Sequence, residues 1–287
     1  MGVSTLRGPT RIARQDNGVF AGMFGAHVVR TAFQPIFAFA RDRLALIAYE
    51  GLARPFRETE QIAPQSFFAS VPPHHRLKVE TMTRSLHLLN AGACLAGHVS
   101  VFINLDPSLF GEAGTAESAL RDMRAVLRRA AIDPRRVVCE VTEQKTASEA
   151  ALVRFVQALR LNGFRIAVDD YGSASSDINR IKELKPDIVK FDAKWITRLM
   201  ETGPGFALLA AMVSSFGDQG IETVFEGIEE GWQLELAEKA GASMVQGFVL
   251  ARPEIVPAVF AAVDLARFPG SPPIPQAAST VPETGTA

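Results

Sequence analysis

The chain has 287 residues, of which 47% are hydrophobic and 21% charged, so it can bury a sizeable core as one large α/β domain or two small ones. Its net charge of −1 provides no overall positive field, so nucleic acid is not expected as an electrostatic partner. No run approaches the ~18 apolar residues of a membrane span, and the first residues lack the apolar core of a secretory signal. We therefore expect no direct membrane insertion and predict a cytoplasmic location.

The two ends of the chain differ from its middle. Residues 1–26 are mixed, Gly-rich and weakly patterned, which predicts an N-terminal arm that is loose or forms a short cap. Residues 269–287 are rich in Pro, Ser and Thr and are predicted to form a disordered tail. No boundary interrupts residues 27–268, so we expect a single domain there, with no attached sensor or cyclase domain. Cys94 and Cys139 lie in apolar stretches without metal-ligand spacing, which favours buried, reduced thiols.

Apolar, β-rich runs alternate with helical patterns through the domain, which is typical of a mainly parallel sheet. The candidate strands are residues 33–38, 44–50, 99–104, 136–141, 165–169, 188–191, 222–226 and 244–249. The link between the first two, about residues 39–43, is too short for a crossover helix, so these strands form a hairpin and one of them runs against the rest. Eight strands with outer helices favour a (β/α)₈ TIM-like barrel with one reversed strand, and a doubly wound open sheet is the alternative.

Residues 148–162 show the clearest helical pattern. Leu152, Phe155 and Leu159 fall on one face together with Val156. Ser148 can cap the start and the glycine at 163 can close the end. Gly241 closes a helix near 230–240 in the same way.

Polar residues occupy the C-terminal ends of the strands, where a barrel places its catalytic groups. They are Glu50, Asn104, Glu140, Glu143, Asp169, Asp170, Lys190, Asp192, Glu226, Glu229 and Gln246. The neighbouring carboxylates Asp169 and Asp170 repel each other and lose solvation at the end of a buried strand, so they need a counter-charge from a divalent metal or from a close Lys or Arg. A ring of such carboxylates would destabilise the fold without cations, so the pattern predicts a metal site.

Oxygen ligands without His or Cys select hard cations, so Mg²⁺ or Mn²⁺ is favoured over Zn²⁺. The histidines, all before residue 99 and without metal-ligand spacing, are His27, His74, His75, His87 and His98. Two hard ions ~3.5–4 Å apart can activate water for phosphodiester hydrolysis. Lys190 has two readings at this point: an ion pair with Asp170 or Asp192, or a contact to the attacking water or the phosphate.

Eight blocks between about residues 33 and 253 together resemble the EAL family, the bacterial phosphodiesterases that linearise cyclic di-GMP. In order they are Phe33-Gln-Pro-Ile36, Tyr49-Glu-Gly-Leu-Ala-Arg54, Ile103-Asn-Leu105, Glu140-Val-Thr-Glu143, Asp169-Asp-Tyr-Gly172, Val189-Lys-Phe-Asp192, Glu226-Gly-Ile-Glu229 and Val245-Gln-Gly-Phe248. The resemblance implies a barrel whose first strand is antiparallel. It also implies a homodimer that binds cyclic di-GMP.

The resemblance assigns roles to residues at the strand ends. Two metal ions would be held by Glu50, Asn104, Glu140, Asp169, Asp170 and Glu226. Catalysis would rest on Glu50, on Lys190 orienting the attacking water, and on Glu226 as ligand or general base. Substrate would contact Gln34, Leu52, Arg54, Asp192, Glu229 and Gln246, with Arg54 gripping a phosphate through its bidentate guanidinium. Glu143 would anchor the loop that follows Asp170 and links the site to the dimer interface.

Two departures from the family pattern stand near the site. Gly51 replaces the alanine of the signature, which removes a methyl beside Glu50 and adds backbone freedom. After Gly172 the chain reads Ser173-Ala-Ser-Ser-Asp177, where the family usually reads Thr-Gly-Tyr-Ser-Ser. The altered loop leaves room for lowered or differently regulated activity.

Three functions remain open from the sequence. The first is a metal-dependent phosphodiesterase that opens cyclic di-GMP to linear pGpG and lowers this second messenger. The second is a weak or inactive EAL domain that acts as a cyclic di-GMP receptor or protein scaffold. The third is an unrelated structural barrel. Retention of Glu50, Asp169 and Lys190 favours the enzyme.

Overall fold

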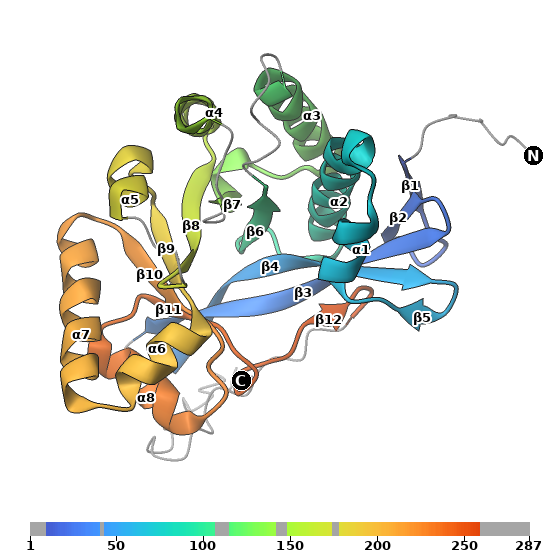
Figure 1. Ribbon diagram of the computed structural model, residues 1–287. Helices are drawn as coiled ribbons and strands as arrows, with labels where there is room; N and C mark the ends of the chain where they lie inside the picture. Colours follow the sequence, from blue (N-terminus) through green and yellow to red (C-terminus); the bar gives the residue numbers. More distant parts are fainter. Residues whose placement is uncertain (1–9, 41–42, 107–114, 142–147, 174–177, 259–287) are drawn as a thin grey trace, which may run out of the picture.

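The computed structural model describes residues 10–40, 43–106, 115–141, 148–173 and 178–258 (Figure 1). The predicted tail, residues 269–287, lies outside these ranges. Within them, Cys139 is buried and Cys94 is half-buried, and both are free thiols. The helices are α1 (Pro64–Ser70), α2 (Pro73–Cys94), α3 (Thr115–Ala130), α4 (Glu149–Leu161), α5 (Ile178–Leu184), α6 (Ala193–Met200), α7 (Gly203–Asp218) and α8 (Gly231–Ala240). None of them, over the described ranges, is long and apolar enough to cross a bilayer.

Eight strands form a closed barrel. They are β3 (His27–Ala40), β4 (Arg43–Arg57), β6 (Ser100–Leu105), β7 (Val137–Val141), β8 (Arg165–Tyr171), β9 (Ile188–Phe191), β10 (Glu222–Phe225) and β11 (Met244–Val245). The order β3-β11-β10-β9-β8-β7-β6-β4 is closed by pairing of β3 with β4. Strand β3 runs antiparallel to both of its barrel neighbours, and the other barrel pairs are parallel. The predicted barrel with an antiparallel first strand is confirmed, and the open-sheet alternative is wrong because β3 has a partner on each side.

The lengths of three strands differ most from the prediction. Strands β3 and β4 have 14 and 15 residues, so this hairpin extends well past the barrel (Figure 1). Strand β11 has only two residues, where six were expected. Beyond the end of β11, Gly247 packs against backbone: a Cβ there would lie 2.0 Å from the carbonyl oxygen of Ile228.

The three helix termini argued from sequence are confirmed. The Ser148 side chain accepts a hydrogen bond from the Ala151 amide at 3.2 Å, as an N-cap does. Gly163 follows α4 with φ +88°, and Gly241 ends α8 with φ +81°. Both glycines adopt the left-handed conformation that stops a helix.

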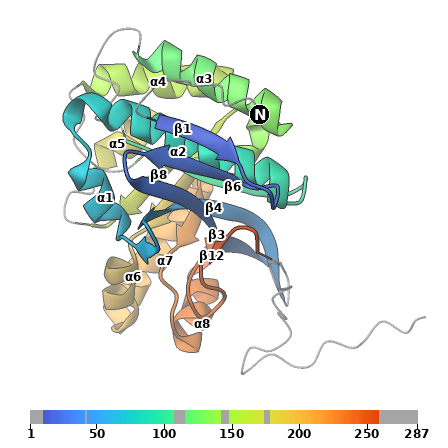
Figure 2. The ribbon, with the colours of Figure 1, turned by 90° about the vertical axis from the view of Figure 1, so that its right-hand side faces the viewer.

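The prediction of a loose arm is wrong over residues 10–24. Strands β1 (Thr10–Arg14) and β2 (Phe20–Phe24) form a hairpin that pairs with β3 and lies against α2 (Figure 2). The short strands β5 (Glu60–Gln61) and β12 (Glu254–Ile255) pair with β4 and β3. Strands β1 and β2 have five residues each, which is too short for a clear alternation of apolar and polar residues. Their stability comes from packing on α2 rather than from their own pattern.

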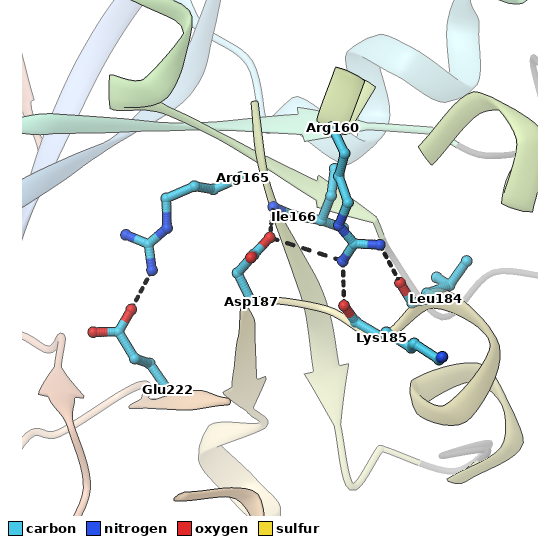
Figure 3. Close-up of polar contacts among 7 residues, drawn as sticks. All are labelled: Arg160, Arg165, Ile166, Leu184, Lys185, Asp187 and Glu222. Atoms are coloured by element: carbon cyan, nitrogen blue, oxygen red, sulfur yellow. Dashed lines mark hydrogen bonds and ion pairs between the residues drawn. The ribbon is translucent and has the colours of Figure 1, made fainter. Parts of the chain in front are cut away.

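Charged residues at the N-terminal end of the barrel pair with one another. Arg165 at the start of β8 pairs with Glu222 at the start of β10 (Figure 3). Asp187 accepts the Ile166 amide at 2.8 Å and lies 3.8 Å from Arg160. These pairs join the starts of β8, β9 and β10, so this end has a structural role and the opposite end is available for chemistry.

Candidate active site

The barrel interior is built in layers, each strand contributing one side chain to each layer. The lower layer is apolar and consists of Ile36, Ala48, Phe102, Val138, Ala167, Ile188, Val224 and Met244. Because side chains alternate along a strand, the residue two positions nearer the C-terminal rim faces the same interior. That next layer is Gln34, Glu50, Asn104, Glu140, Asp169, Lys190, Glu226 and Gln246. We call these eight residues the polar ring. The polar ring includes the three residues that we expected to be catalytic, Glu50, Lys190 and Glu226.

Lys190 lies at the centre of the polar ring and is 1% exposed. Its Nζ lies 2.5 Å from Glu140 Oε1, 2.6 Å from Glu226 Oε1, 3.2 Å from Asp169 Oδ1 and 3.7 Å from Glu50 Oε2. Neither ion pair that the sequence suggested for Lys190, with Asp170 or Asp192, occurs among these contacts. One ammonium therefore faces four carboxylates, and the group retains an excess of negative charge.

The excess negative charge changes the proton affinities of these groups. Burial raises the pKa of Glu140 well above its ordinary value, Glu50 and Asp169 add to the rise, and Lys190 offsets only part of it. Burial, with the charges of Asp169 and Glu50, raises the pKa of Glu226 to about 8 despite Lys190. Burial alone would lower the pKa of Lys190, but the surrounding carboxylates raise it well above its ordinary value. The ammonium is held in its charged form, and the carboxyls need a further cation to ionise fully.

Asp169 and Asp170 come from an irregular stretch of β8. The pairing of β8 with β9 shifts register between Val168 and Tyr171, and Asp170 has φ +58°. Asp169 is buried and Asp170 is exposed, so the pair spans from the ring to its mouth. One oxygen of each, with one of Glu226, lie within 4.8 Å of one another. A bulge at the end of a barrel strand thus turns two successive carboxylates towards a third.

The donor atoms of the polar ring fit a hard divalent cation. Glu140 Oε2 is fully buried and has no hydrogen-bond partner within the described ranges. Asn104 and Glu140 are neighbours in the β6–β7 pairing, and Asn104 Nδ2 lies 3.5 Å from Glu50 Oε1. Apart from the Lys190 ammonium, the ring offers carboxylate and amide groups without sulfur or imidazole. A buried carboxylate oxygen with no donor is costly unless a cation binds it, so this site suits a hard divalent cation.

The residues expected to contact substrate lie partly in the polar ring and partly beyond the barrel rim. Gln246 Nε2 donates to Glu50 Oε2 at 2.9 Å, and Gln34 in the ring lies 3.4 Å from the Ala251 carbonyl oxygen. Leu52 and Arg54 follow Glu50 at steps of two along β4, so they continue its face beyond the barrel rim. Burial lowers the pKa of Arg54 and the charge of Glu50 opposes this change.

Three predicted residues lie apart from the ring or outside the described structure. Asp192 caps α6, because its Oδ1 accepts the Trp195 amide at 2.8 Å. An Asp just before a helical run is an ordinary N-cap signal, which sequence reasoning missed. Glu229 is exposed beyond the end of β10. Glu143 lies outside the described residues.

The stability of the metal-free protein is expected to fall as the pH rises from about 5 to 8. The native pKa of Glu226 is about 8 against an ordinary 4.5, so between these values the native state holds a proton that the unfolded chain releases. Bound metal replaces that proton, so Mg²⁺ should raise the melting temperature more at about pH 8 than at about pH 6. Melting curves in EDTA and in Mg²⁺ test this. An equal Mg²⁺ shift at both pH values would contradict it, and Glu226→Gln should reduce the dependence.

Known proteins share this fold and sequence pattern. Residues 23–253 match the model of the EAL domain. The bifunctional diguanylate cyclase/cyclic di-GMP phosphodiesterase MucR of Pseudomonas aeruginosa is 29% identical over 160 residues, covering 55% of this chain and 23% of MucR. The cyclic di-GMP phosphodiesterase RocR of the same organism is 26% identical over 243 residues, covering 83% of this chain and 58% of RocR. The chain thus matches less than two thirds of each relative.

A solved structure has a similar fold. BlrP1 of Klebsiella pneumoniae, in complex with calcium and cyclic di-GMP, superposes with a TM-score of 0.68 at 25% identity. The match covers 79% of this chain and 56% of BlrP1. Because the family model spans most of the chain, and the barrel with its reversed strand agrees, the chain belongs to the EAL domain family.

Proposed function

We propose that this chain is a cyclic-guanylate-specific phosphodiesterase that hydrolyses cyclic di-GMP to linear pGpG with Mg²⁺ or Mn²⁺. The observation that carries the proposal is the polar ring, in which four carboxylates converge on one lysine at the C-terminal rim of an EAL barrel. The named activities of MucR and RocR, and the calcium and cyclic di-GMP bound to BlrP1, support the substrate and the need for a divalent cation.

The metal ligands in this proposal are Glu50, Asn104, Glu140, Asp169, Asp170 and Glu226, which together would hold two ions. When bound, the ions supply an acidified water and charge stabilisation for the phosphate. Glu140, buried without a hydrogen-bond donor for Oε2 in the described structure, gains a partner in this way. The two neighbouring aspartates lose their mutual repulsion for the same reason.

The chain's own groups carry the rest of the reaction. Lys190, kept charged by its carboxylate neighbours, fixes the attacking water by hydrogen bonding. Glu226, whose proton the bound metal would displace, accepts the proton of that water. The water oxygen bonds to phosphorus, the bond from phosphorus to the ribose 3′ oxygen breaks, and this oxygen takes up a proton from solvent, which leaves pGpG. Arg54 holds a phosphate of the substrate beyond the barrel rim.

Incubating the purified chain with cyclic di-GMP and Mn²⁺ or Mg²⁺, and following pGpG by chromatography, tests the function. We expect turnover with metal and none in EDTA, because the carboxylates cannot act on phosphate without cations. Glu50→Ala should abolish turnover. Tight binding of cyclic di-GMP without turnover would identify a receptor instead, and full activity of Glu50→Ala would contradict the metal assignment. A homodimer and a cytoplasmic location remain predictions.

A further inference from the structure

Gly51, in the strand that carries Glu50, lies against His87 of the outer helix α2. Gly51 follows Glu50 in β4, so it faces away from the barrel interior and towards α2. A Cβ at position 51 would lie 3.0 Å from His87 Cβ and 3.1 Å from His87 Cγ. The space that a methyl group would fill is therefore taken by the histidine.

His87 is fixed by a buried chain of hydrogen bonds. Its Nδ1 lies 2.9 Å from Thr31 Oγ1, which also accepts Asn90 Nδ2 at 2.9 Å. Asn90 in turn accepts the Phe20 amide at 2.7 Å and donates to the Phe20 carbonyl oxygen at 3.0 Å. His87 is 3% exposed, and Thr31 and Asn90 are fully buried. The ring therefore cannot turn away from Gly51 without breaking a buried hydrogen bond, which is costly.

The protonation of His87 agrees with this arrangement. Burial, with the charge of Arg54 adding to it, lowers the pKa of His87 to about 3, so the ring is neutral. Because Thr31 Oγ1 already accepts from Asn90, its own hydrogen can be donated to Nδ1 of His87. A neutral ring held this way acts as a fixed wall and adds no charge beside the polar ring.

We propose that His87 is a positioning residue that sets how far β4 carries Glu50 into the barrel. Glycine leaves the backbone at 51 unusually free, and contact with a fixed side chain removes that freedom. Groups behind a ligand commonly decide its orientation and so its affinity for metal. As far as it concerns metal binding, the inference rests on the proposed function. It also explains why the alanine of the EAL signature is absent here: His87 occupies its place.

Gly51→Ala tests the inference. The added methyl must displace β4 or α2, so we expect the Mn²⁺ affinity measured by calorimetry to fall at least about tenfold. Gly22→Ala is a matched control, since its Cβ would lie 3.1 Å from Met82 Cε on the same helix but far from Glu50 in the chain. That variant should keep the wild-type Mn²⁺ affinity. An unchanged affinity in Gly51→Ala would overturn the inference.

A double-mutant cycle separates this role from a merely structural one. His87→Ala removes Cγ and Cδ2, which would lie 3.1 and 3.4 Å from the new methyl, and also removes the anchor to Thr31. The Cβ contact at 3.0 Å remains, but α2 is no longer held by Thr31 and can recede from it. The loss of Mn²⁺ affinity caused by Gly51→Ala should then be at least about threefold smaller in the His87→Ala background. Additive losses would overturn the inference.

A structural readout keeps the inference testable without metal. If wild-type protein binds no Mn²⁺, the proposed function fails, and the crystal structure of Gly51→Ala decides the inference alone. We expect Glu50 to move from its position 2.9 Å from Gln246 Nε2. An unmoved Glu50 carboxylate would overturn the positioning role.

Discussion

Lys190→Met is expected to destabilise the metal-free protein by about 3–5 kcal/mol and to abolish turnover. Lys190 is 1% exposed and contacts the carboxylates of Glu50, Glu140, Asp169 and Glu226. Methionine matches the length of the side chain, so packing changes little. What is lost is the ammonium that partly balances four carboxylates, of which Glu226 is half-buried and the other three are buried. The carboxyls must then take up protons or repel one another, and either response costs folding free energy.

The dependence of stability on pH shows whether the unbalanced carboxylates cause the destabilisation of Lys190→Met. Without the ammonium the native pKa values of the carboxyls rise further, so the native state holds more protons than the unfolded chain over a wider range. Stability of Lys190→Met should therefore fall more steeply with rising pH than that of wild type. Urea denaturation in EDTA at several pH values measures it, because urea is uncharged and leaves the electrostatics unscreened.

Lys194→Met is a suitable control for this substitution. Lys194 is exposed on α6, four residues from Lys190, and the same replacement there should change stability by less than about 0.5 kcal/mol. A Lys190→Met protein as stable as the control, with the same pH slope, would show that the ring carboxyls are largely protonated and need no cation. Mg²⁺ should restore part of the lost stability, since it supplies the missing positive charge.

Much of the site can be predicted from the sequence, because inward-facing side chains recur at every second position along a strand. On the seven parallel strands each ring residue stands two positions after an apolar residue of the lower layer, as Glu140 stands after Val138, and on the reversed β3 Gln34 stands two positions before Ile36. Hydrophobic alternation predicts the strands, and the strands aim the polar residues at one interior. The hairpin of β3 and β4 could also be predicted, because the link between them is too short for a crossover helix, whereas the resemblance to the EAL family identified β3 as the reversed strand.

The features that sequence could not predict depend on contacts between distant segments. Strands β1 and β2 are stable because Asn90 on α2 binds both backbone groups of Phe20, 70 residues away. The partners of Lys190 come from four different strands, so no local spacing gives them. In the sequence, Gly51 only lacks the methyl group of the alanine that the family signature has. The fold shows that His87 occupies the space of that methyl group. The local pattern of apolar and polar residues predicts the helices and strands, whereas the packing of distant segments determines which side chains are in contact.

Glu140→Gln is expected to remove metal binding and yet to leave the metal-free protein at least as stable as wild type. Glu140 is fully buried, and burial with the nearby charges of Glu50 and Asp169 raises its pKa. Glutamine is neutral and nearly isosteric, so it relieves this repulsion while its amide oxygen can still accept from Lys190. Loss of one ligand should lower turnover about 10³-fold or more, since a bound ion supplies several kcal/mol to the transition state.

The two effects are measured separately. In EDTA the melting temperature of Glu140→Gln should equal or exceed that of wild type, and added Mg²⁺ should no longer raise it. Glu238→Gln, on the exposed face of α8, is the matched control and should keep both the Mg²⁺ shift and turnover. A Glu140→Gln protein that still gains stability from Mg²⁺ would show that Glu140 is not a ligand. A lower melting temperature in EDTA would instead show that Glu140 stabilises the fold through its ion pair with Lys190, so that the four carboxylates are balanced without metal.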